Sequence, residues 1–236
     1  MIKEILKLTQ DELRNKVSTE LNKYYKEIIT TTEYVAARGE IPIVLVAHLD
    51  TVFDERTRND MLIVEDTEKG ILWSPEGLGA DDRAGVAMIL TILEKTNLRP
   101  HILFTTDEET LAAGAIAVAS LEMKEKLFGK VSYLIELDRQ GYKESVFYNC
   151  NNPKFEKFIN SFGFETEVGT FTDISIICPK WKIAGVNLSV GYYYEHSFIE
   201  HFYLGAWIDT LHKVIKMLKI NNNQIWKYIP KEYKKE

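Results

Sequence analysis

The sequence predicts an α/β fold with three layers, in which helices cover both faces of a mixed, mostly parallel central sheet. Short apolar runs rich in Val, Ile and Leu alternate along the chain with segments of helical periodicity. The apolar runs are continuous instead of alternating with polar residues, which is typical of strands buried on both faces. The 236 residues, 45% of them hydrophobic, are enough for one core, so a single domain over residues 1–236 is expected.

The N-terminal part of the sequence predicts a helix, then a buried strand, then a hairpin. Thr9 and Glu12 form a capping-box pattern at the start of a helix over residues 10–28, within an N-terminal helical region of residues 1–30. A buried strand over residues 43–47 ends at His48. Residues 61–64 and 71–73 flank a polar turn and predict a hairpin.

The remaining elements continue the alternation of strands and helices. Strands are expected over residues 101–106, 131–137, 146–148 and 183–190. Helices are expected over residues 83–95, 111–126 and 153–162. The clearest amphipathic stretch predicts a C-terminal helix over residues 197–219, opened by a capping-box pattern from Ser197 to Glu200.

Charge and composition exclude several classes of partner. The net charge of -6 and the pI of about 5.5 disfavour binding to nucleic acid. No apolar run approaches the length of a membrane helix, so no membrane partner is expected. The two cysteines, Cys150 and Cys178, and an N-terminus without a long apolar core predict a cytoplasmic protein. The sequence leaves the oligomeric state open.

Polar side chains gather where the predicted strands end, which is where ligands bind in open α/β sheets. They belong to His48 and Asp50, Asp81 and Asp82, residues 107–109, Asp138 and His196. Each cluster alone has an ordinary structural explanation, such as a helix cap or a packed histidine. So many carboxylates at one edge would repel one another without cations. Imidazole and carboxylate together suit zinc, and two ions about 3.5–4 Å apart could share one carboxylate.

Five motifs in order along the chain resemble a known superfamily. They are VAHLDTV at residues 46–52, GADDRAG at 79–85, TDEE at 106–109, ELD at 136–138 and EHS at 195–197. The chain thus resembles the zinc-dependent exopeptidases, which include dizinc aminopeptidases, tripeptidases and related carboxypeptidases. The interval between Asp138 and His196 is too short for the lid or dimerisation domain of larger relatives, so a single catalytic domain is expected.

The resemblance implies a role for each matched residue. His48, Asp81 and Asp138 would surround one metal ion, and Asp81, Glu109 and His196 the other, with Asp81 and not Asp82 as the bridge. Glu108 matches the general base, and Asp50 would orient the imidazole of His48. The cofactors would be two divalent ions, Zn²⁺ first, with Co²⁺ or Mn²⁺ as alternatives.

The resemblance does not decide whether the substrate is a peptide or an N-acyl amino acid. An aminopeptidase or other exopeptidase is the first expectation. The alternatives are an amidohydrolase or deacylase, a cell-wall peptide hydrolase, a single-metal glutaminyl cyclase and a non-catalytic metal-binding protein. Asp173 matches a position that lines the site, and one tyrosine of residues 192–194 could bind the oxyanion. His101, His201 and His212 match no motif.

Overall fold

The computed structural model describes residues 1–220 and 224–232, and its main feature is an eight-stranded mixed sheet. The strand order is β1-β2-β6-β3-β7-β10-β8-β9. The pairs β6–β3, β3–β7, β7–β10 and β8–β9 are parallel, and the other three pairs are antiparallel. The strands are β1 Ile28–Thr30, β2 Tyr34–Ala37, β3 Ile41–His48, β6 Pro100–Thr105, β7 Tyr133–Arg139, β8 Glu144–Val146, β9 Glu165–Glu167 and β10 Gly185–Ser189. The predicted α/β fold is confirmed.

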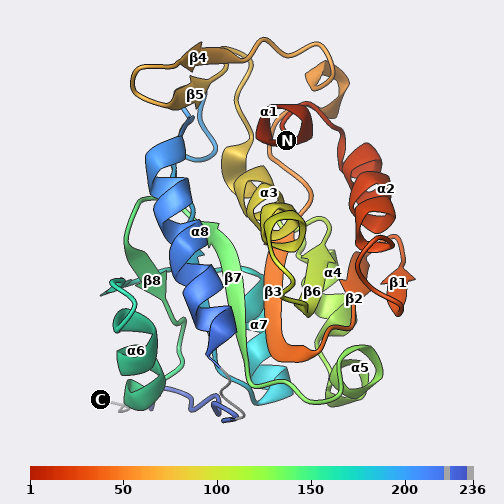
Figure 1. Cartoon of the computed structure of the whole chain (residues 1–236), viewed down its shortest axis with the longest axis vertical. Coiled ribbons are helices and arrows are strands. Elements are labelled where there is room, and N and C mark those ends of the chain that lie inside the picture. The colour runs from red at the N-terminus through yellow and green to blue at the C-terminus, as the bar shows by residue number, and fades with distance from the viewer. Residues whose placement is uncertain (221–223, 233–236) are drawn as a thin grey trace.

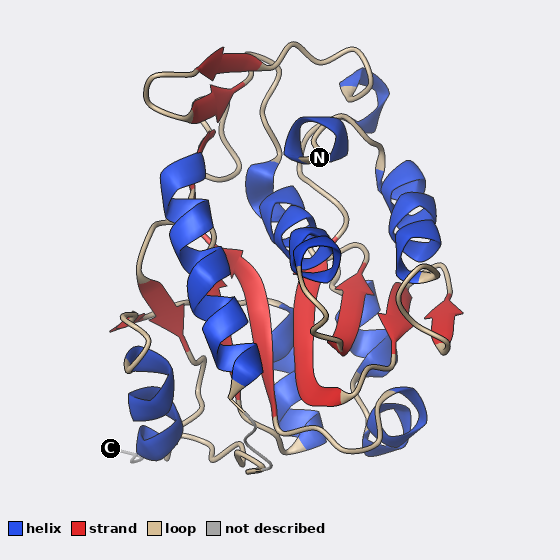
Figure 2. Cartoon of the chain, viewed as in Figure 1, coloured by secondary structure: helices blue, strands red, loops and turns tan. Residues whose placement is uncertain are grey.

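Helices cover both faces of this sheet (Figures 1 and 2). In β3, the side chains of Ile43 and Leu45 join one hydrophobic core, and those of Val44 and Val46 join a second core on the opposite face. In the view of Figure 1, α3 and α8 lie in front of the sheet and α4 and α7 lie behind it. The helices are α1 Ile2–Ile5, α2 Gln10–Leu21, α3 Ala80–Lys95, α4 Ala113–Val118, α5 Leu121–Leu127, α6 Pro153–Asn160, α7 Asp173–Trp181 and α8 Leu204–Lys219, with a 3-10 turn at Glu55–Thr57. None of the described helices is both long enough and apolar enough to cross a bilayer.

A second, antiparallel sheet lies beyond the upper edge of the large one in Figure 1. Its order is β11-β12-β5-β4, with β4 Val64–Asp66, β5 Ile71–Trp73, β11 Tyr192–Tyr193 and β12 His201–Tyr203. The predicted hairpin is therefore present, although its first strand begins at Val64 and not at residue 61. Because β12 pairs with β5, this sheet holds the loop that connects β11 to β12 and carries His196.

Several of the helix predictions are wrong. The helix predicted over residues 10–28 ends at Leu21, and Ile28–Thr30 instead pairs with β2 as an edge strand. The helix predicted over residues 111–126 is two helices, because Ser120 leaves the helical conformation and its hydroxyl caps α5. The helix α7 was not predicted, since Pro179 lies inside it and the sequence pattern around a proline disfavours a helix.

The start of the C-terminal helix is also corrected. It begins at Leu204, and the pattern from Ser197 to Glu200 caps no helix. The hydroxyl of Ser197 donates to the carbonyl of Tyr194, and residues 201–203 form β12. His201 is thus on a strand and not on a helix.

His101, at the start of β6, gives a prediction about stability and pH. The side chain is 4% exposed, its Nδ1 accepts from the Gly39 amide at 3.0 Å, and burial lowers its pKa to about 4. Unfolded His101 binds a proton near pH 6.5, whereas folded His101 resists protonation until about pH 4, so stability falls as pH decreases through this window. When the pH is lowered from 7 to 4, the free energy of unfolding of the wild type should fall by about 3 kcal/mol more than that of His101→Asn. Urea unfolding of both proteins at the two pH values measures this difference. A pH-independent difference between the two proteins would contradict this.

Candidate metal centre

The predicted site residues converge at one edge of the large sheet. His48 is the last residue of β3, Asp138 lies near the end of β7, and residues 107–109 follow β6. Because β3 is parallel to both β6 and β7, these three chain segments leave the sheet on the same side. Asp81 lies at the start of α3, and His196 approaches from the small sheet.

Two imidazoles contact the two oxygens of a single carboxylate. His48 Nε2 lies 3.1 Å from Asp81 Oδ1 and 3.6 Å from Asp138 Oδ1. His196 Nε2 lies 3.2 Å from Asp81 Oδ2 and 3.0 Å from Glu109 Oε2. Asp81 therefore stands between two groups, each made of one imidazole and one further carboxylate.

The spacing of these atoms fits divalent metal ions. Two ligand atoms that are each about 2.0–2.1 Å from a tetrahedral zinc ion are separated by roughly 3.3 Å. The four distances above lie on either side of that value. One ligand atom each from His48, Asp81 and Glu109 also lie within 4.8 Å of one another. The donor set and its geometry thus suit a divalent ion bound around Asp81.

The carboxylate of Asp50 connects the two halves of the site. Its Oδ1 lies 3.2 Å from His48 Nδ1, which leaves Nε2 of that ring free to face Asp81. The same carboxylate accepts from the backbone amides of Glu108 at 3.1 Å and Glu109 at 2.9 Å. Burial opposes ionisation, but His48 and these amides hold the pKa of Asp50 below its usual value.

Asp82 has a different environment from Asp81. It is fully buried, and its two oxygens accept from the backbone amides of His48 at 3.2 Å and Gly85 at 3.0 Å. Gly85 is required here, since a Cβ at this position would lie 2.2 Å from the carbonyl oxygen of Leu137. Asp82 thus joins the start of α3 to the end of β3, and only Asp81 faces both imidazoles.

Asp138 is held by residues that sequence reasoning mostly missed. Its Oδ1 accepts from the Tyr192 hydroxyl and its Oδ2 from the Thr172 hydroxyl, both at 3.0 Å, and its amide donates to Asn187 at 2.9 Å. Thr172 and Asn187 were not predicted, because neither belongs to a recognisable motif.

Among the three adjacent tyrosines, Tyr192 is the one that contacts Asp138 in the described structure. Tyr193 stacks on His201, and Tyr194 is 58% exposed. Asp173 is fully buried at the start of α7 and accepts a hydrogen bond from the Thr105 hydroxyl. Asp173 does not contact either imidazole in the described hydrogen bonds and ion pairs.

The electrostatics of the site show an excess of negative charge. Burial raises the pKa of Glu108 to about 8, and the charge of Asp138 adds to this shift while His48 opposes it. Burial and the charge of Asp81 raise the pKa of Asp138 to about 7. Hydrogen bonds to Asp81 and Glu109 raise the pKa of His196 to about 11. Divalent cations are the counter-charge that such a cluster of acids favours.

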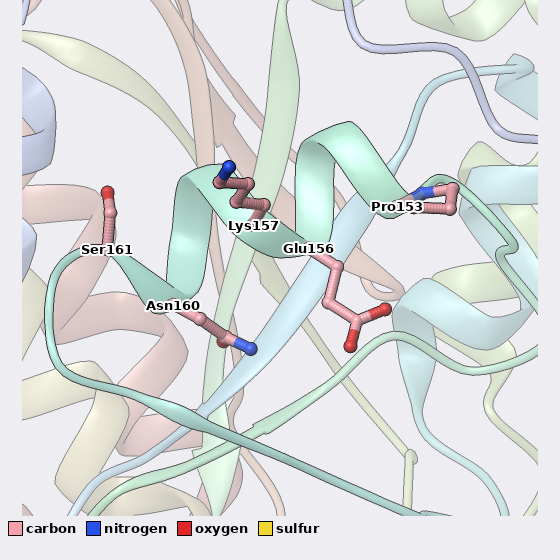
Figure 3. A pocket seen from close by; sticks show the side chains of 5 residues that line it. All are labelled: Pro153, Glu156, Lys157, Asn160 and Ser161. Carbon is pink, nitrogen blue, oxygen red and sulfur yellow. The ribbon is translucent and has the colours of Figure 1, made fainter.

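A separate hollow on α6 has none of these features. Figure 3 shows that it is lined by Pro153, Glu156, Lys157, Asn160 and Ser161. Glu156 already accepts from the Thr166 hydroxyl at 2.8 Å, and no imidazole lines the hollow. It offers no chemistry comparable to that of the site at the sheet edge.

Comparison with known families agrees with the geometry. Residues 27–166 match Peptidase family M28. The chain belongs to this family. The matched region contains His48, Asp81, Glu108, Glu109 and Asp138, and His196 lies beyond it. Peptidases of family M28 generally depend on metal ions, which is consistent with the cluster around Asp81.

Solved structures share the fold of this M28 chain at low sequence identity. A tripeptidase from Staphylococcus aureus has a TM-score of 0.72 at 14% identity, covering 93% of this chain and 96% of that one. An aminopeptidase from the archaeon Desulfurococcus kamchatkensis has a TM-score of 0.74 at 15% identity, with 94% of each chain covered. The aminopeptidase PepT from Bacillus cereus has a TM-score of 0.68 at 15% identity, covering 92% of this chain and 96% of that one. No curated protein matches the sequence.

Proposed function

We propose that this M28 chain is an exopeptidase with two divalent cations, and that it removes residues from the free N-terminus of peptides. The observation that carries the proposal is the carboxylate of Asp81, which directs one oxygen to His48 and the other to His196. His48 and Asp138 would complete the ligands of one ion, and Glu109 and His196 those of the other. Zinc is the ion that this mixture of imidazole and carboxylate favours.

Glu108 is the proposed general base. Bound cations would supply Lewis acidity that polarises the scissile carbonyl and acidifies water. Glu108 is half-buried beside Glu109, and its amide is fixed by Asp50. Its carboxylate would take a proton from the attacking water and deliver it to the leaving amine. Tyr192 would keep Asp138 in place through its hydroxyl.

The proposal is tested by measuring metal content and hydrolysis together. Elemental analysis of the purified chain should find about two equivalents of metal per chain. Aminoacyl chromogenic substrates and short peptides should be hydrolysed, and a chelator should abolish the activity. Restoring Zn²⁺, Co²⁺ or Mn²⁺ in turn should identify the most effective ion.

The other outcomes separate the competing functions. One equivalent of metal together with cyclisation of N-terminal glutamine would favour a cyclase. Hydrolysis of N-acyl amino acids but not of peptides with a free N-terminus would favour a deacylase. Two bound ions without turnover of any substrate would favour a metal-binding protein.

A further inference from the structure

Glu200 lies fully buried next to the loop that begins α3. Its Oε2 accepts from the backbone amide of Gly79 at 2.6 Å, and its Oε1 accepts from the backbone amide of Asp81 at 3.0 Å. We propose that Glu200 is a positioning residue that sets the distance between Asp81 and His196, and thereby maintains the ion site on the His196 side. This inference rests on the proposed two-cation function.

The backbone around Asp81 needs an acceptor from elsewhere in the chain. The first amides of a helix have no partner within the helix, and a side chain at the N-cap usually supplies one. Asp82 supplies it for the regular part of α3, because its carboxylate accepts from the Gly85 amide at 3.0 Å. Asp81 and Asp82 have non-helical backbone angles, so the amides of Gly79 and Asp81 lie before this regular part, and Gly79, with a left-handed φ of 67°, has no side chain to accept a hydrogen bond. Glu200 supplies both acceptor oxygens from more than a hundred residues further along the chain.

The same residue anchors the loop that carries His196. His196 is four residues before Glu200, between β11 and β12, and the Glu200 amide donates to the carbonyl of Ser197 at 3.0 Å. A single buried carboxylate therefore joins the His196 loop to the backbone of Asp81.

The two ion sites differ in how much they depend on this contact. The side chain of His48 is 2% exposed, lies at the end of a central strand and is oriented by Asp50. The side chain of His196 is 50% exposed, and His196 lies in a loop, where its own backbone has a positive φ of 61°. Loss of the Glu200 contact should thus weaken the ion site of His196 much more than that of His48.

The test uses Glu200→Gln in two backgrounds, each of which removes one imidazole. Gln keeps the shape of Glu, but the NH₂ group that replaces one oxygen donates hydrogen bonds and cannot accept one from a backbone N–H, so one of the two bonds is lost. With His48→Ala, only the His196 side should bind Zn²⁺, and adding Glu200→Gln should raise its Kd about 10- to 100-fold. With His196→Ala, only the His48 side remains, and adding Glu200→Gln should change its Kd by less than about threefold.

The readout is Zn²⁺ affinity measured by competition with a chromophoric chelator, and circular dichroism checks that each protein is folded. Glu200→Asp provides a second variant, because its shorter side chain reaches at most one amide. Equal effects of Glu200→Gln in both backgrounds, or none in the His48→Ala background, would overturn the proposal. A wild-type protein that binds fewer than two ions would instead contradict the proposed function.

Discussion

Replacement of Glu108 by Gln should lower kcat by about 10²–10⁴-fold while both metal ions remain bound. Gln has nearly the same shape as Glu, but it cannot accept the proton from water or return it to the leaving amine. The amide of Glu108, which donates to Asp50, is unaffected by the change. KM should change little, since the carboxylate is proposed to act in the reaction and not in the binding of substrate.

The neighbouring residue provides the control. Glu109→Gln removes a carboxylate oxygen that lies 3.0 Å from His196 Nε2, and it should lower the metal content as well as kcat. Elemental analysis and steady-state kinetics on the two variants separate a base from a ligand. Loss of metal from Glu108→Gln, or normal turnover in that variant, would show that Glu108 has been assigned the wrong role.

Replacement of Asp81 by Ala should remove both ions at once. Asp81 offers one oxygen to each half of the site, so its loss affects both ions, whereas His196→Ala affects one. Because metal ions supply several kcal/mol of transition-state stabilisation, kcat/KM should fall by more than about 10³-fold. The metal content should fall from about two equivalents to near zero, compared with about one for His196→Ala.

Asp11→Ala is a matched control for this experiment, because Asp11 is also an aspartate near the start of a helix but its side chain is 75% exposed. It should retain both ions and normal kinetics. If Asp81→Ala retained one tightly bound ion, Asp81 would belong to one half of the site only, and another residue would have to bridge.

The parts of the fold that sequence predicted well are those with a strong local signal. The strands β3 and β7 are continuous apolar runs, and two-sided burial makes such runs easy to recognise. The change from helix to strand over residues 22–30 depends instead on the pairing of β1 with β2, which residue periodicity does not encode. The start of α8 was misplaced because Glu200 makes its contacts far away in the sequence and not within a helix.

The same distinction applies to the candidate site. The residues that surround Asp81 could be predicted, because they follow strands and occur in motifs of recognisable order. The partners that hold them, such as Thr172 and Asn187, come from other elements and bear no local signature. Of the three tyrosines, the contact with Asp138 distinguishes Tyr192, and that contact depends on the path of the chain after β10.

The position of His196 in the loop between β11 and β12 also bears on the order in which the site assembles. The contact of His48 with Asp81 closes a loop of 33 residues, and the contact of His196 with Glu109 closes one of 87. The entropy of loop closure makes the longer loop less favourable by about 1 kcal/mol. Chain connectivity therefore favours a folding route in which His48 meets Asp81 first, whereas the contact of His48 with Asp138, 90 residues along the chain, and those of His196 form later.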